Sequence, residues 1–114
     1  MKLSMVIADD ERLSLKGEEM LIKRAFPDID IIGVAENGID FKNMVESLNP
    51  DMAIVDVRMP GITGLEAIEL LRNKGCRTHF IINTAYSDFD YVKTALNMKA
   101  DAYLVKPGSR EESI

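Results

Sequence analysis

Short apolar segments alternate with longer amphipathic segments along most of the chain. Short apolar runs are typical of buried strands, whereas apolar residues three or four apart are typical of helices. The predicted strands are Leu3–Ala8, Ile29–Ala35, Met52–Val55, Phe80–Ile82 and Ala102–Val105. The predicted helices are Glu11–Phe26, Phe41–Leu48, Leu65–Leu71 and Phe89–Met98. This alternation predicts a doubly wound α/β domain, with a five-stranded parallel sheet covered by helices on both faces.

The two ends of the chain differ in how well the pattern defines a helix. In the first helix, apolar and small residues recur at helical spacing and predict its inner face: Leu13, Gly17, Met20, Leu21 and Ala25. After the last strand, residues 106–114 contain a single apolar residue, which is too little for a helix that closes the sheet. We therefore expect residues 1–114 to be one domain cut from a longer protein, with its last helix truncated or missing.

The composition excludes several classes of site. The 114 residues include one cysteine, Cys76, and one histidine, His79, which argues against an internal disulfide and against a zinc site built from such residues. The net charge of -5 argues against direct nucleic-acid binding by this domain. No apolar run approaches the roughly 20 residues of a membrane span, and no secretory leader opens the chain. These features predict a cytoplasmic protein with no membrane contact.

Candidate site residues follow four of the five predicted strands, whereas the second strand runs into Glu36-Asn37, which is interpreted as a plain turn. Asp9 and Asp10 follow the first strand, Asp56 follows the third, Thr84 the fourth and Lys106 the fifth. Ligands of doubly wound sheets bind at the carboxyl ends of the strands, so these side chains are expected to meet. Clustered carboxylates need a neutralising partner, and magnesium prefers such carboxylates together with phosphate oxygens. The sequence therefore predicts a Mg²⁺-dependent site for a phosphoryl group.

A carboxylate in such a site can itself accept the phosphoryl group as an acyl phosphate. Asp56 is the best candidate because it stands alone at the centre of the set, whereas Asp9 and Asp10 are adjacent and suit metal ligation. Lys106 supplies a positive charge, and Thr84 supplies a hydroxyl donor.

These residues carry a resemblance to a known family. The chain resembles the receiver domain of bacterial two-component response regulators in four motifs, which occur in the family's order and spacing. The motifs are Asp9-Asp10-Glu11, Asp56 followed by Met59-Pro60-Gly61, Thr84-Ala85, and Tyr103 through Lys106-Pro107. The resemblance covers nearly the whole chain and implies the flavodoxin-like strand order 2-1-3-4-5.

The resemblance also implies roles for the metal ligands and the acceptor. Asp56 would be the phosphorylation site and a Mg²⁺ ligand, together with Asp10 and the backbone carbonyl of Arg58. Asp9 would act on the ion largely through water. Lys106 would contact the phosphoryl oxygens.

A second implied set of residues transmits the signal. Thr84 would move to hydrogen-bond the phosphoryl group, and Tyr103 would turn inward as Thr84 moves. The bond between Lys106 and Pro107 would be cis. Arg58 and Tyr86, two places after Asp56 and Thr84, would flank the phosphoryl group.

The resemblance further implies partners. The phosphoryl group would come from a sensor histidine kinase or a small phosphodonor. An output domain outside this chain would read the change and regulate transcription. The stretch from Tyr86 to Val92 resembles regulators whose output is an AraC-type DNA-binding domain. A homodimer on activation is a further expectation.

Each of these residues also has a purely structural interpretation. Asp9-Asp10 could be a helix cap, because acidic residues are favoured at helix N-termini. Thr84 could be an ordinary strand residue, Lys106 a surface lysine and Tyr103 a core or rim tyrosine. A small basic cluster of Arg72, Lys74 and Arg77 is interpreted as a solvated face.

Three other functions compete with the phosphoacceptor switch, which turns over no free substrate. An aspartyl phosphatase would need a second aspartate two places after Asp56, where this chain has Arg58. An interaction module that no longer takes phosphate would not need the full acidic set with Lys106. A flavodoxin-type protein would need a Gly-, Ser- and Thr-rich phosphate cradle after the first strand, where this chain is acidic.

Overall fold

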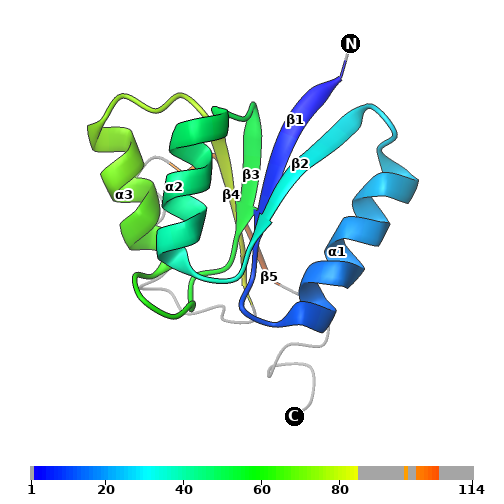
Figure 1. The fold of residues 1–114 in the computed structure, drawn as a ribbon, viewed down its shortest axis with the longest axis horizontal. Helices are drawn as coiled ribbons and strands as arrows, with labels where there is room; N and C mark the ends of the chain where they lie inside the picture. Colours follow the sequence, from blue (N-terminus) through cyan, green and yellow to red (C-terminus); the bar gives the residue numbers. More distant parts are fainter. Residues whose placement is uncertain (1, 85–96, 98–99, 106–114) are drawn as a thin grey trace.

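The structure is a computed structural model that describes residues 2–84, 97 and 100–105. Its sheet has five parallel strands in the order β2-β1-β3-β4-β5 (Figure 1). The strands are β1 (Leu3–Ala8), β2 (Ile29–Ala35), β3 (Met52–Val55), β4 (His79–Thr84) and β5 (Ala102–Val105). The predicted fold class and strand order are confirmed, and β4 extends beyond its predicted bounds at both ends.

The described helices lie on both faces of the sheet. The described helices are α1 (Arg12–Ala25), α2 (Gly38–Leu48) and α3 (Gly64–Asn73). In Figure 1, α1 lies on one face of the sheet, and α2 and α3 lie together on the other. No helix among the described residues is both long and apolar enough to cross a membrane. The predicted fourth helix and the closing segment 106–114 lie outside the described residues.

Local hydrogen bonds set the start of α2 and α3. The side chain of Asn37 accepts a hydrogen bond from the backbone N–H of Asp40 at 2.8 Å, so α2 begins at Gly38, before the predicted Phe41. Thr63 and Glu66 form a reciprocal capping box at the start of α3.

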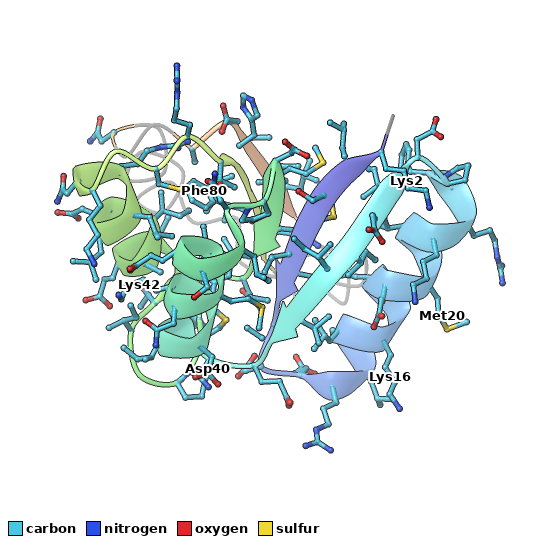
Figure 2. All side chains as sticks on the ribbon, turned by 45° about the horizontal axis from the view of Figure 1, so that its top comes forward. Lys2, Lys16, Met20, Asp40, Lys42 and Phe80 are labelled. Atoms are coloured by element: carbon cyan, nitrogen blue, oxygen red, sulfur yellow. The ribbon has the colours of Figure 1, made fainter. Side chains whose placement is uncertain are left out.

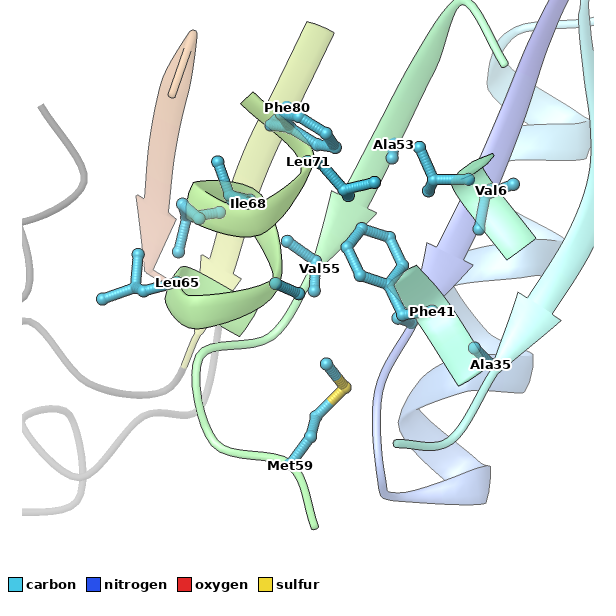
Figure 3. Packing of buried hydrophobic residues seen from close by; sticks show 14 of the residues in the cluster. Val6, Ala35, Phe41, Ala53, Val55, Met59, Leu65, Ile68, Leu71 and Phe80 are labelled. Atoms are coloured by element: carbon cyan, nitrogen blue, oxygen red, sulfur yellow. The ribbon is translucent and has the colours of Figure 1, made fainter. Parts of the chain in front are cut away.

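The main core fills the space between the sheet and the α2–α3 pair. Figure 3 shows Phe41 from α2 and Leu71 from α3 against the sheet residues Val55 and Phe80. The rings of Phe41 and Phe80 meet edge to face, with centroids 6.2 Å apart. This side of the sheet is therefore closed by tightly packed aromatic and aliphatic side chains.

The inner face predicted for α1 is wrong. Leu15 and Ile22 are the buried residues of this helix, whereas Leu13 is 86% exposed and Met20 is 62% exposed. Figure 2 shows Met20 extending from the outer side of α1. The helix carries apolar residues on two opposite faces, and the sheet packs against the face with the β-branched Ile22. Spacing alone does not distinguish the two faces.

One irregularity interrupts the ladder between β1 and β2. Met5 pairs with Ile31, but the next residue, Val6, pairs with Gly33, so Ile32 is an extra residue on β2. Since β2 is the first strand in the sheet order, this bulge lies on an edge strand.

Candidate functional site

Three aspartates converge at the carboxyl ends of β1 and β3. One carboxylate oxygen from each of Asp9, Asp10 and Asp56 can be chosen so that all three lie within 4.8 Å of one another. Asp9 and Asp56 are buried, at 1% and 8% exposure, whereas Asp10 is exposed. The structure thus brings together the three acidic residues that the strand-end pattern predicted.

Backbone hydrogen bonds hold two of these aspartates in line with the sheet. The N–H of Asp9 donates to the carbonyl of Ala35 at 3.1 Å, and the N–H of Asp56 donates to the carbonyl of Ala8 at 3.1 Å. Both residues therefore continue the parallel ladder by one step beyond their strands. Their positions follow from the sheet rather than from a loop conformation.

Asp9 has a structural contact in addition to its place in the cluster. Its Oδ1 accepts a hydrogen bond from the backbone N–H of Glu11 at 3.0 Å. Glu11 is the N-cap residue of α1, and its own side chain forms no cap hydrogen bond within the described chain. Asp9 therefore steadies the turn into α1 without being the cap of that helix, and this contact is compatible with its place in the acidic cluster.

Gly64 is a site-supporting residue that sequence reasoning missed. A Cβ added at this position would lie 2.1 Å from the backbone carbonyl oxygen of Asp56, so any side chain here would force the backbone to shift. The N–H of Gly64 also donates to the carbonyl of Val57 at 2.8 Å. The start of α3 thus presses directly against the backbone of the buried aspartate. In the sequence, the capping-box residues Thr63 and Glu66 mark the start of this helix, but they do not indicate the close approach of Gly64 to Asp56.

A hollow of about 460 Å³ adjoins the acidic cluster. Its lining residues are Asp10, Val57, Arg58, Met59, Pro60, Thr63 and Leu65. Figure 3 shows Met59 extending from the loop after β3 toward Phe41, so this loop is anchored in the main core. Arg58 is exposed on the same loop. Of the three aspartates of the cluster, Asp10 lines this hollow.

The strand ladder places the remaining predicted residues only by their backbone. Thr84 is the last residue of β4 and pairs with Val105, the residue before Lys106. Tyr103 lies in β5 and pairs with Ile82. The side chains of Thr84 and Tyr103, and all of Tyr86, Lys106 and Pro107, lie outside the described residues. In the described backbone, the carboxyl ends of β4 and β5 lie at the same end of the sheet as the acidic cluster.

Comparison with known proteins decides the family. The family model for the response regulator receiver domain matches residues 5–114. The chain belongs to this family. Receiver domains are phosphoacceptor signalling switches of two-component systems, and this chain is one of them. Such a domain is a signalling module rather than an enzyme that turns over a free substrate.

Individual relatives give the same result. The chain is 35% identical over 109 residues to the nitrate/nitrite response regulator protein NarL of Escherichia coli, covering 96% of this chain and 50% of that protein. It is 34% identical over 110 residues to the transcriptional regulatory protein DesR of Bacillus subtilis, covering 96% of this chain and 54% of that protein. The receiver chain therefore spans about half the length of these two curated relatives.

Solved structures agree with the fold. A DNA-binding response regulator of the LuxR family from Staphylococcus aureus superimposes with a TM-score of 0.88 at 34% identity, covering 97% of this chain and 92% of that one. The signal receiver domain of the NarL regulator from Mycobacterium tuberculosis gives a TM-score of 0.89 at 26% identity, covering 97% and 89%.

Proposed function

We propose that Asp56 of this receiver domain is the phosphoacceptor. The supporting observation is the convergence of three carboxylates within 4.8 Å, with Asp56 nearly buried among them. In the proposed reaction, a carboxylate oxygen of Asp56 attacks the phosphorus of a phosphohistidine or of acetyl phosphate. The new P–O bond forms as the P–N or P–O bond to the donor breaks, and the leaving imidazole or acetate keeps the electron pair.

The donor set fits Mg²⁺, which takes oxygen ligands that include carboxylates. We assign the protein ligands to the carboxylates of Asp10 and Asp56 and to the backbone carbonyl of Arg58, with Asp9 acting largely through water. When bound, the ion would offset the negative charge of the carboxylates and of the incoming phosphoryl group. The chain's own part is to hold the carboxylates at this spacing, through the ladder hydrogen bonds of Asp9 and Asp56.

Three further residues are assigned to the phosphoryl group and the switch. Lys106 contacts the phosphoryl oxygens, Thr84 hydrogen-bonds them, and Tyr103 changes its position with Thr84. The supporting observation is the pairing of Thr84 with Val105, which brings the carboxyl ends of β4 and β5 to one edge of the sheet.

The partners of the whole protein are part of the proposal. The phosphoryl donor is a sensor histidine kinase in the cytoplasm, and residues 1–114 are the receiver part of a longer protein that regulates transcription. The S. aureus relative is described as a DNA-binding regulator of the LuxR family. This favours a LuxR-type output domain over the AraC-type domain expected from Tyr86 to Val92. Pairing of two copies on activation completes the proposal.

The test is the intact mass of the protein after incubation with acetyl phosphate, with and without Mg²⁺. We expect a Mg²⁺-dependent gain of one phosphoryl group, which Asp56→Asn abolishes without unfolding the domain. Asp30→Asn, at an exposed position of β2, is the matched control and should be phosphorylated like the unsubstituted chain. Uptake by Asp56→Asn at the unsubstituted rate would show that another residue is the acceptor. Sustained hydrolysis of a generic phosphomonoester would instead indicate a phosphatase.

A further inference from the structure

A polar contact joins α1 to the carboxyl end of β4. The side-chain Nδ2 of Asn83 donates a hydrogen bond to Oε1 of Glu18 at 2.6 Å, across 65 residues of sequence. Both residues are half-buried, and the second carboxylate oxygen of Glu18 is withdrawn from solvent. The contact therefore lies between the helix and the sheet rather than on the open surface.

The chemistry of this contact favours a fixed geometry. A carboxylate and an amide that are withdrawn from water lose free energy unless they bond to each other or to another partner. Hydrogen bonds to a charged acceptor are shorter and stronger than neutral ones, which agrees with the 2.6 Å distance. Loss of either side chain removes this hydrogen bond between α1 and β4.

The hydrogen bond joins α1, which follows the turn with Asp9 and Asp10, to β4, which ends at Thr84. The helix α1 begins at Arg12, directly after the turn that carries Asp9 and Asp10. The strand β4 ends at Thr84, the residue after Asn83. Sequence analysis singled out neither Glu18 nor Asn83.

We propose that Glu18 and Asn83 are a positioning pair for phosphorylation. The pair holds the end of β4, and with it Thr84, at a fixed place relative to the acidic cluster. The inference rests on the proposed function, because it assigns Thr84 to the phosphoryl group. Neither member of the pair touches the reacting atoms, so both act through the backbone that carries Thr84.

The first test measures phosphorylation by acetyl phosphate in four variants. We expect Glu18→Ala and Asn83→Ala each to slow the reaction roughly threefold to tenfold, since displacing a reacting group by about 1 Å can cost up to about 100-fold. The half-saturating Mg²⁺ concentration should stay unchanged, because the acidic cluster lies on β1 and β3. The double variant should be no slower than either single variant, as for residues that act as a unit. Glu18→Gln keeps an acceptor and should retain most of the rate.

A matched control separates positioning from stability. Ser4→Ala removes two hydrogen bonds between the Ser4 hydroxyl and Asp51, one donated to the carboxylate and one accepted from the backbone N–H, which join β1 to the start of β3 at the far end of the sheet. It should lower the melting temperature and leave the phosphorylation rate of the folded protein unchanged. The positioning role would be overturned if Glu18→Ala and Asn83→Ala fold and are phosphorylated at the rate of the unsubstituted chain. It would also be overturned if the rate losses of the two single variants add in the double variant.

A second readout needs no phosphoryl donor. Amide hydrogen exchange at Thr84 should be faster in Glu18→Ala and Asn83→Ala than in the unsubstituted chain, and Ser4→Ala should not reproduce this local change. Unchanged exchange at Thr84 would overturn the positioning pair even if the chain is phosphorylated. Absence of phosphorylation in the unsubstituted chain would overturn the proposed function, while exchange at Thr84 would still decide whether the pair holds β4.

Discussion

Among the residues that the structure describes, the two faces of the sheet are built differently. Against α2 and α3, the described residues form one continuous cluster that includes Phe41, Phe80 and the fully buried Ile68. Against α1, the described cluster has four buried members: Met5, Ile7, Leu15 and Ile22. The α1 side also contains the polar contact between Glu18 and Asn83. One face is a closely packed apolar core, and the other mixes apolar and polar contacts.

This difference bears on how each side of the domain supports Asp56, the proposed acceptor. Asp56 follows β3, and Gly64 of α3 packs directly against its backbone. The buried Asp56, the proposed acceptor, thus rests on the α2–α3 side, whose side chains leave little room for movement. On the α1 side, the hydrogen bond between Glu18 and Asn83 adds a polar contact to the apolar packing of the helix on the sheet, and the proposed positioning pair acts through it. We therefore expect the α2–α3 side to dominate stability and the α1 side to tune the rate of phosphorylation.

The largest expected difference in the free energy of unfolding comes from an isoleucine-to-alanine substitution made on each face of the sheet. Ile68→Ala in α3 should cost about 4 kcal/mol and Ile22→Ala in α1 about 2 kcal/mol, within the range for large-to-small core substitutions. Ile68 is fully buried, whereas Ile22 retains 7% exposure on the less filled side. Chemical denaturation of both variants measures the difference. Equal losses would show that the two faces are packed equally well.

A pair of glycine substitutions gives the next largest difference. Gly64→Ala should cost about 1–3 kcal/mol by overpacking against the backbone of Asp56, and it should slow phosphorylation as well. Gly17→Ala lies in the middle of α1, where an added Cβ meets nothing within 4 Å. It should stabilise the protein by about 0.5–1 kcal/mol, because alanine favours a helix interior over glycine. Thermal unfolding measures the changes in stability, and the reaction with acetyl phosphate measures the change in rate. A Gly64→Ala variant with unchanged stability and rate would contradict the close approach of Gly64 to Asp56.

The smallest expected effect is a pH dependence of stability on the α2–α3 side. Hydrogen bonds from Lys42, at 2.6 Å, and from Lys74, at 3.2 Å, lower the pKa of Glu46. A lowered pKa contributes stability above the unfolded-state pKa of about 4.3, and this contribution is lost as the pH falls through the folded-state value. In Glu46→Gln, the melting temperature should therefore fall less between neutral and acidic pH than it does in the unsubstituted chain.

The control for this prediction is a similar ion pair on the other face. Glu19 of α1 contacts a single lysine, Lys23, at 3.3 Å. Glu19→Gln should change the acid limb less than Glu46→Gln does, because Glu46 has two cationic partners. If the pH dependence of the melting temperature changes as much or more in Glu19→Gln, then the second lysine beside Glu46 adds nothing to the pH-dependent stability.

The sequence predicted the sheet and the acidic site because both depend on simple periodicities. Four of the five strands have short apolar runs whose ends are marked by polar or turn residues, and parallel pairing brings their carboxyl ends together. Asp9, Asp10 and Asp56 therefore could be placed in one site without coordinates. Their convergence follows from topology, so it needed no knowledge of side-chain packing.

Features that depend on packing were missed or misjudged. The inner face of α1 was assigned to Leu13 and Met20 because spacing alone cannot choose between two apolar rows on one helix. Arg72 was expected on a solvated face, but its guanidinium donates to the carbonyls of Cys76 and Thr78 and lies 4.6 Å from the Phe80 ring centroid. Gly64 gave no signal, because a close approach between backbones leaves no periodic pattern in the sequence.

The bulge at Ile32 has a consequence for how the domain behaves at high concentration. An edge strand offers unsatisfied backbone donors and acceptors, and a flat edge can recruit the same strand of another molecule and seed aggregation. Here β2 carries the exposed apolar residues Ile32 and Val34, which would favour such recruitment. The extra residue breaks the regular spacing of the edge and increases its local twist, so a straight incoming strand cannot continue the ladder. The irregularity thereby disfavours strand addition between copies of this domain at the β2 edge.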